Sequence, residues 1–140
     1  MRLVCLLGLI LMAACSGNGV TCAQVITVGG PVVQITSVTN SQTGSAISQF
    51  TLSNFARNGQ QQDAALLVAG IPNTNARAVN GTLVCSDTCG FGQSDGSYTF
   101  TVSAAGVQDK VVTVAAKYSG SVAQACSRME TGGTPIAITM

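Results

Sequence analysis

The sequence predicts an all-β sandwich domain of seven to nine short strands. In several runs, apolar residues alternate with hydroxyl residues at a period of two, which is the pattern of strands that bury one face. Pairs that contain glycine, asparagine or aspartate separate these runs at short intervals, and helical periodicity is almost absent. A strand that buries one face must pack it against a second layer, so two antiparallel sheets packed face to face are the expected architecture.

The clearest strands lie on either side of residues 105–110. Apolar side chains alternate with threonine and serine over residues 98–104, and a similar alternation returns over residues 112–118. The segment between them is short and contains a glycine, which favours a hairpin. Asp95-Gly96 is a strong turn pair, and we expect residues 90–96 to form a loop.

The run Gly96-Ser97-Tyr98-Thr99-Phe100 and the hairpin that follows resemble the last hairpin of immunoglobulin-like domains in bacterial surface proteins. In that family a Gly-x-Tyr-x-apolar run begins the penultimate strand, and the tyrosine hydroxyl bonds back to the backbone in a tyrosine corner. Gly96, Tyr98 and Phe100 occupy those places, although antibody-type domains have a cysteine at the position of Phe100 and this chain lacks tryptophan. The resemblance implies an immunoglobulin-like antiparallel β-sandwich.

Further strands are expected on both sides of this hairpin, at residues 25–28, 32–39, 48–52, 122–126 and 135–140. Polar residues and glycine cluster in the expected loops, which are residues 40–45, 58–62 and 128–133. Two segments allow more than one interpretation. Residues 64–69 fit a buried strand or a short helix, and residues 77–85 fit a tight hairpin at Asn80-Gly81 or one continuous strand.

The amino terminus has the pattern of an export signal. Met1-Arg2 supplies one positive charge, and the apolar run that follows is too short to span a bilayer. The run ends in Leu11-Met12-Ala13-Ala14-Cys15, which resembles the lipobox of bacterial lipoproteins. That resemblance implies a signal peptide at residues 1–14, cleavage before Cys15 and lipidation of its thiol. Residues 15–24 would then form a tether and residues 25–140 the β-sandwich domain.

The alternative is an ordinary secretory signal, cut after Ala14 or near Gln24. The number of cysteines that remain depends on the cleavage site. With Cys15 acylated, an even set remains, which suggests two disulfides whose pairing the sequence leaves open: Cys22, Cys85, Cys89 and Cys126. Cleavage near Gln24 would instead leave an odd number, so the even set favours the lipoprotein interpretation.

Charge is sparse and balanced. Charged residues make up 8% of the chain, against about 25% in typical soluble domains. From residue 15 onward, the chain has five basic and five acidic residues, and neither sign forms a cluster. Nucleic acid is therefore not an expected partner, because binding to phosphates needs concentrated lysine and arginine. A net charge near zero also removes repulsion between copies, which permits self-association.

The sequence argues against an enzyme, and we expect no metal or other cofactor. Histidine, the most common general base, is absent, and the carboxylates are scattered. Three residues separate Cys85 from Cys89, which favours structural cysteines over a thioredoxin-like redox pair. Asp87 and Asp95 bracket a glycine-rich loop, where turn-forming aspartates are a better interpretation than a calcium site.

These observations predict an exported protein with a structural, adhesive or binding role. We expect it to be lipid-anchored in the bacterial cell envelope, with a protein or a glycan at the cell surface as its partner. The loop at residues 86–96 is the expected contact surface, because loops on a rigid sandwich carry recognition. Its binding candidates are Asp87, Phe91 and Asp95. The alternative is a soluble, secreted inhibitor or effector domain stabilised by disulfides.

Overall fold

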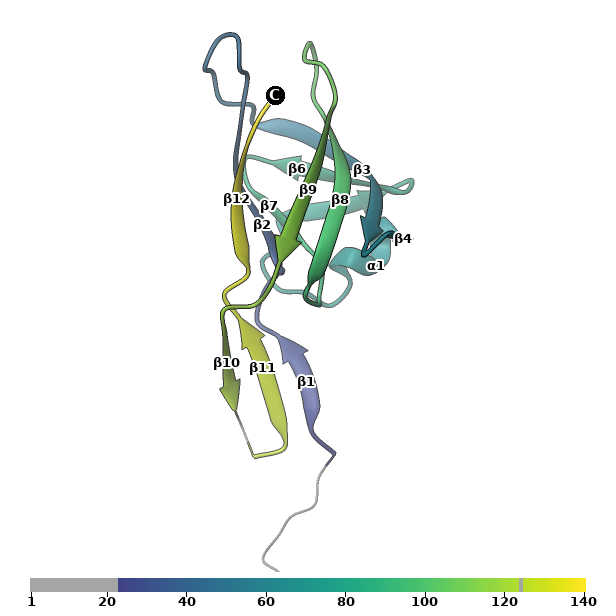
Figure 1. The fold of residues 1–140 in the computed structure, drawn as a ribbon, viewed down its shortest axis with the longest axis vertical. Coiled ribbons are helices and arrows are strands. Elements are labelled where there is room, and N and C mark those ends of the chain that lie inside the picture. Colours follow the sequence, from purple (N-terminus) through teal and green to yellow (C-terminus); the bar gives the residue numbers. More distant parts are fainter. Residues whose placement is uncertain (1–22, 124) are drawn as a thin grey trace, which may run out of the picture.

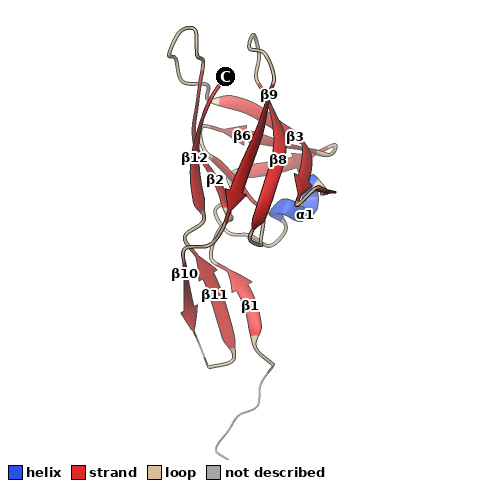
Figure 2. Cartoon of the chain, viewed as in Figure 1, coloured by secondary structure: helices blue, strands red, loops and turns tan. Residues whose placement is uncertain are grey.

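The computed structural model describes residues 23–123 and 125–140, and this part of the chain is mostly β-structure. Figures 1 and 2 show a sandwich from which a small sheet projects at one end. The elements, in chain order, are β1 (Val25–Val28), β2 (Val33–Thr39), β3 (Gln49–Arg57), β4 (Gln60–Gln61), α1 (Ala64–Val68), β5 (Ala76–Val79), β6 (Thr82–Ser86), β7 (Cys89–Phe91), β8 (Gly96–Ser103), β9 (Lys110–Ala116), β10 (Gly120–Ala123), β11 (Ser127–Thr131) and β12 (Thr134–Thr139).

The all-β prediction is confirmed, and the strands form three sheets. One sheet has the order β5-β6-β3-β8-β9, with β4 paired to β3, and a second has the order β12-β2-β7. Their inward side chains share a single hydrophobic core, so these two sheets form the sandwich. β12 pairs with β2 in parallel, whereas the neighbours within the larger sheet are antiparallel. The structure has more strands than the seven to nine expected, because several short strands show no recognisable alternation in the sequence.

The period-two alternation correctly predicts the inward face of β8 and β9. In β8, Tyr98, Phe100 and Val102 are buried, while the hydroxyl residues between them lie toward solvent. β3 breaks this rule after Leu52, because its register with β8 shifts between Ser53 and Ala56. Asn54 adopts a φ of 53° at this irregularity, and the phase change turns Phe55 into the core.

The two segments that allowed more than one interpretation form a short helix and a tight hairpin. Residues 64–68 form the short helix α1, whose first turn is capped by Asp63: its carboxylate accepts a hydrogen bond from the Ala65 amide at 2.8 Å. Asn80-Gly81 forms the tight turn between β5 and β6, with φ values of 48° and 78°. Positive φ at both central residues is what a hairpin turn of this kind requires. The only helix in the described part of the chain, α1, is too short to cross a membrane.

The third sheet, with the order β1-β11-β10, projects beyond the sandwich (Figure 1). Both of its faces are open to solvent, and every residue of β10 is exposed. The expectation of a loop at residues 128–133 is wrong, because β11 covers Ser127–Thr131. A run that contains Arg128 and Glu130 lacks a buried face, and it becomes a strand only because β1 and β10 supply partners on both sides.

Three chain crossings join the projecting sheet to the sandwich. They follow β1, β9 and β11, and Tyr118 lies in the middle one. Its hydroxyl donates to the carbonyl of Gly30 at 2.8 Å, in the first crossing, while the Ser119 amide donates to the carbonyl of Gly132 at 2.8 Å, in the third. Burial raises the pKa of Tyr118 to about 12, so this hydroxyl remains a hydrogen-bond donor at ordinary pH. These contacts tie the crossings together at the base of the sandwich.

Candidate functional site

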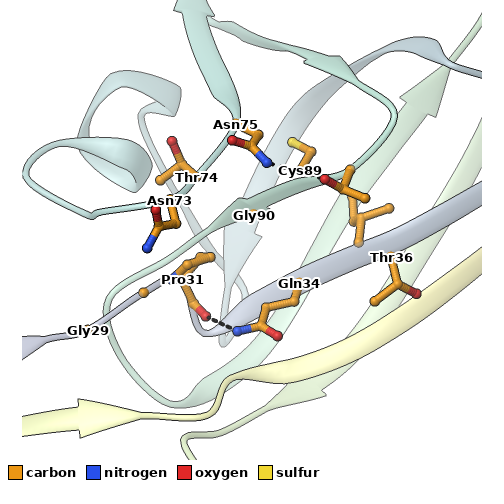
Figure 3. Close-up of a pocket in the computed structure, with 12 residues that line it drawn as sticks. Gly29, Pro31, Gln34, Thr36, Asn73, Thr74, Asn75, Cys89 and Gly90 are labelled. Atoms are coloured by element: carbon orange, nitrogen blue, oxygen red, sulfur yellow. Dashed lines mark hydrogen bonds between the residues drawn. The ribbon is translucent and has the colours of Figure 1, made fainter.

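A depression of about 320 Å³ lies where the first crossing, β2, β7 and the loop after α1 meet (Figure 3). Its lining combines amide and hydroxyl side chains with a few apolar groups and backbone. The lining residues are Gly29, Gly30, Pro31, Gln34, Ile35, Thr36, Asn73, Thr74, Asn75, Thr88, Cys89 and Gly90. They come from three stretches that are far apart in the chain, residues 29–36, 73–75 and 88–90, so only the folded sandwich assembles this surface.

The loop after α1 is held in one shape by residues that tolerate a left-handed backbone. Gly70, Asn73 and Asn75 have φ values of 69°, 58° and 50°. Asparagine accepts such angles more readily than most side chains. The loop is fixed to the sandwich by the Thr74 carbonyl, which accepts a hydrogen bond from the Gly90 amide at 2.7 Å. Asn75 reinforces this attachment by donating from Nδ2 to the Thr88 hydroxyl at 3.3 Å.

The floor of the depression requires a glycine at position 90. A Cβ atom there would collide with the ring of Pro31 and lie 3.0 Å from the carbonyl oxygen of Val33. Gly90 pairs with Gln34 in the sheet, and the Gln34 side chain donates from Nε2 to the carbonyl oxygen of Pro31 at 3.4 Å (Figure 3). The first crossing therefore packs closely on β7 at the floor of the depression.

The described structure contains a disulfide between Cys85 and Cys89. Cys85 belongs to β6 in the larger sheet and Cys89 to β7 in the smaller one, so the bond links the two layers of the sandwich beside the depression. Cys126 is also disulfide-bonded, and its partner lies outside the described residues. Cys22 and the lipidation candidate Cys15 fall in that part of the chain as well.

The chemistry of the depression is that of a binding surface. None of the described residues that line it carries a charged or titratable side chain, since Cys89 is held in a disulfide. Within residues 23–123 and 125–140, no three histidine, cysteine or acidic side chains gather where they would hold a metal ion. Amides and hydroxyls offer both donors and acceptors, so they suit a neutral polar ligand.

The sequence-predicted binding residues do not line this depression. Asp87 is exposed in the turn between β6 and β7, where its φ is 59° and its amide donates to the carbonyl of Ser48 at 2.6 Å. The Asp95 carboxylate accepts a hydrogen bond from the Tyr118 amide at 2.9 Å, and its carbonyl accepts one from Arg57 Nε at 3.2 Å. Both aspartates therefore lie in turns that these hydrogen bonds hold in place.

Phe91 is not a surface residue. It is 0% exposed, and its ring packs against Phe55, Tyr98 and Phe100. The expectation of an exposed ring in a loop at residues 90–96 is wrong because Cys89–Phe91 forms β7, which pairs with β2 and directs the ring into the core. The neighbouring glycines suggested a loop from the sequence, but they serve close packing instead.

Tyr98 makes the backbone contact that the resemblance implied. Its hydroxyl donates to the carbonyl of Ser94 at 2.7 Å, four residues earlier in the chain. Burial raises the pKa of this hydroxyl, which opposes ionisation and preserves the donor. The bond fixes the turn that leads from β7 into β8.

Comparison with protein-family models, with curated proteins and with solved structures finds no match to this chain.

Proposed function

We propose that this chain is an exported, lipid-anchored protein of the bacterial cell envelope with an adhesive or other binding role. The observation that carries the proposal is the depression beside β7, whose loop is hydrogen-bonded to the sandwich and whose lining contains neutral hydrogen-bonding groups. Such a surface favours recognition over proton transfer, because acid–base chemistry needs a titratable side chain in reach of the ligand. The proposal therefore includes no catalytic activity and no cofactor.

An immunoglobulin-like arrangement of the sandwich is part of this proposal. The support is local: the hairpin of β8 and β9, and the Tyr98 hydroxyl that bonds back to the Ser94 carbonyl. Domains with this architecture place their recognition surfaces on the loops and edges around a rigid core. The depression lies at such a place, because one loop and the edge strand β7 form part of it.

We propose a neutral glycan as the ligand of the depression, with an uncharged protein surface as the alternative. Sugar hydroxyl groups both donate and accept hydrogen bonds, which matches the side chains of Gln34, Asn73 and Thr88. The described lining has no aromatic ring on which a sugar could stack, so each site should bind weakly. Many copies on one surface would convert weak sites into firm attachment through multivalency.

Asn73→Asp tests this assignment. The substitution keeps a side chain that tolerates a positive φ but places a negative charge in the depression. We expect binding to an array of neutral oligosaccharides to fall by about tenfold or more, because a carboxylate cannot donate the hydrogen bond that the Asn73 side-chain amide offers to a sugar oxygen. The measurement uses the full chain, purified in detergent and presented in many copies on fluorescent beads.

Asn80→Asp is the matched control. Asn80 is exposed and has a φ of 48°, but it lies at the tip of the β5–β6 hairpin and does not line the depression. Its substitution should leave glycan binding unchanged. Equal binding by both variants would remove the depression as the site, and binding to a protein instead of any neutral glycan would favour the alternative ligand.

The lipid anchor at Cys15 is tested separately. Cells that produce the full chain are fed an alkyne fatty acid, and the purified protein is examined for incorporated label. We expect label in the wild type and its complete loss in Cys15→Ser, because acylation requires that thiol. Cys5→Ser lies in the proposed signal peptide and should retain the label. An unlabelled wild-type chain would instead favour the soluble, secreted inhibitor or effector.

A further inference from the structure

The edge of β1 differs from the other strand edges in the described structure. Exposed edges usually carry charges, proline or a covering segment that discourages pairing with another chain. β5 carries Arg77, β9 begins with Lys110, β12 contains Pro135, and the Gly90 amide of β7 already bonds to the loop after α1. β10 and β4 are uncharged, but glycine and alanine make β10 a poor strand former, and β4 has only two residues.

β1 has none of these protective features. Its sequence, Val-Ile-Thr-Val, consists of β-branched residues, which pair well in sheets. Val25 is 57% exposed and Ile26 is 67% exposed, although both are large and apolar. In the described structure, β1 pairs only with β11, so its second edge is unpaired.

The backbone groups at this free edge can be identified from the pairing with β11. The Val25 amide donates to the Cys126 carbonyl at 3.1 Å, and the Gly29 amide donates to the Glu130 carbonyl at 2.8 Å. In a strand paired in parallel, the amide and carbonyl of alternate residues point to the same side. Val25, Thr27 and Gly29 therefore face β11, while Ile26 and Val28 present their amides and carbonyls outward.

Two copies satisfy all of these outward groups in one register. In an antiparallel pair, opposite residues exchange both backbone hydrogen bonds when both of them point toward the partner strand. This condition places Ile26 opposite the second copy's Val28, and Val28 opposite the second copy's Ile26. Thr27 then lies on the twofold axis, and one sheet continues through both copies.

The surroundings of β1 favour this pairing. A groove of about 510 Å³ runs beside the strand and is lined by Ile26, Thr27, Val28, Ala69, Gly70, Gln93 and Ser94, all of which are uncharged. On β11, Arg128 lies next to Ile26 and Glu130 next to Val28. In the symmetric register, each pair of Ile26 with the second copy's Val28 therefore has Arg128 on one side and the second copy's Glu130 on the other. No like charges come together in this arrangement.

We propose that two copies of this chain associate through antiparallel pairing of their β1 strands. The pairing would cover the exposed Ile26 side chain and complete the edge of a sheet that is open on both faces. The two amino-terminal ends would lie about 13 Å apart along the strands, so tethers from both copies can reach one membrane. The association does not depend on lipidation or on the ligand of the depression.

Photo-crosslinking of the full chain in cells tests this interface. The crosslinking residue p-benzoylphenylalanine replaces Ile26 in two co-produced copies that carry different tags. We expect ultraviolet light to yield an adduct of twice the mass that contains both tags. The matched control has the same residue in place of Val111, which is 66% exposed on the edge strand β9 and should give no such adduct.

A second pair of variants keeps the test independent of crosslinking chemistry. Ile26→Lys should abolish co-purification of the two tagged copies, because it places a charge in the apolar row, whereas Val111→Lys should leave it intact. Equal adducts from positions 26 and 111, an adduct with a different protein, or co-purification that survives Ile26→Lys would each overturn the proposal. The fatty-acid label at Cys15 is read independently, so failure here leaves the lipid-anchor proposal unaffected.

Discussion

Phe91→Ala is expected to lower the free energy of unfolding by about 3–5 kcal/mol. The ring is 0% exposed and lies among three other aromatic rings, with centroid distances of 5.3 Å to Phe55, 5.8 Å to Tyr98 and 5.1 Å to Phe100. Phe91 comes from the smaller sheet and the other three from the larger one, so its removal would leave a cavity between the layers. Part of the loss is therefore the contact across the sandwich itself.

Equilibrium unfolding in urea, followed by tyrosine fluorescence and circular dichroism, measures this change. Val111→Ala is the control, since a residue that is 66% exposed should change the free energy of unfolding by less than about 0.5 kcal/mol. If Phe91→Ala lost less than about 1 kcal/mol, the ring would not be the inter-sheet contact that we describe.

Gly92→Ala is expected to lower the free energy of unfolding by about 2–5 kcal/mol. Gly92 has a φ of 84°, a conformation that strains any residue with a Cβ atom. A Cβ atom there would also lie 2.8 Å from the Tyr98 hydroxyl and 2.9 Å from Cγ1 of Val32. The substitution therefore combines backbone strain with overpacking against two buried side chains.

Gly106→Ala separates these two contributions. Gly106 has a φ of 74° in the β8–β9 hairpin, but nothing lies within 4 Å of an added Cβ. It should lose only the backbone part, about 1–2 kcal/mol. Thermal and urea unfolding of the two variants side by side gives the difference. Equal losses would mean that Tyr98 and Val32 move aside without resistance, which contradicts the packing described around Gly92.

Phe91 and Gly92 also belong to the segment that supports the depression. Gly92 accepts a hydrogen bond from the Val32 amide at 2.9 Å and donates one to the carbonyl of Leu67, in α1, at 2.8 Å. The segment from Gly90 to Gly92 thus connects the floor of the depression, the first crossing and the helix. Damage to Phe91 or Gly92 should therefore weaken ligand binding only as far as it unfolds the sandwich, whereas Asn73→Asp should weaken binding in a stable fold.

The strands of the central hairpin were predictable because their signals are local. Tyr98, Phe100 and Val102 reveal their buried face by alternation alone. At Asn80-Gly81 the sequence left a hairpin and a continuous strand open, and only the pairing of β5 with β6 decides for the hairpin. β11 was not predictable, since neither of its faces is buried and the partners that make it a strand lie elsewhere in the sequence.

In the candidate site, too, some features were predictable from the sequence and others depend on contacts between distant segments. Asn73 and Asn75 follow Pro72, and a turn at this position is visible in the sequence, but its place against Gln34 and Thr36 is not. The glycines around Phe91 are compatible with two opposite structures. In a loop they would allow exposure, while in β7 they permit close approach to Pro31 and Val32, and only the packing of β2 on β7 selects the second.

The sequence alone determined that this chain folds as β-structure with a balanced, sparse charge and without histidine chemistry. It also contained the alternation that chooses the core of β8 and the turn residues that close its hairpins. The tertiary structure decided which short strands exist, that Phe91 is buried, that three distant stretches of the chain form one depression, and that β1 has a free edge. The physical reason is that alternation and turn preference act between neighbours in the chain, whereas these features depend on contacts between residues far apart in sequence.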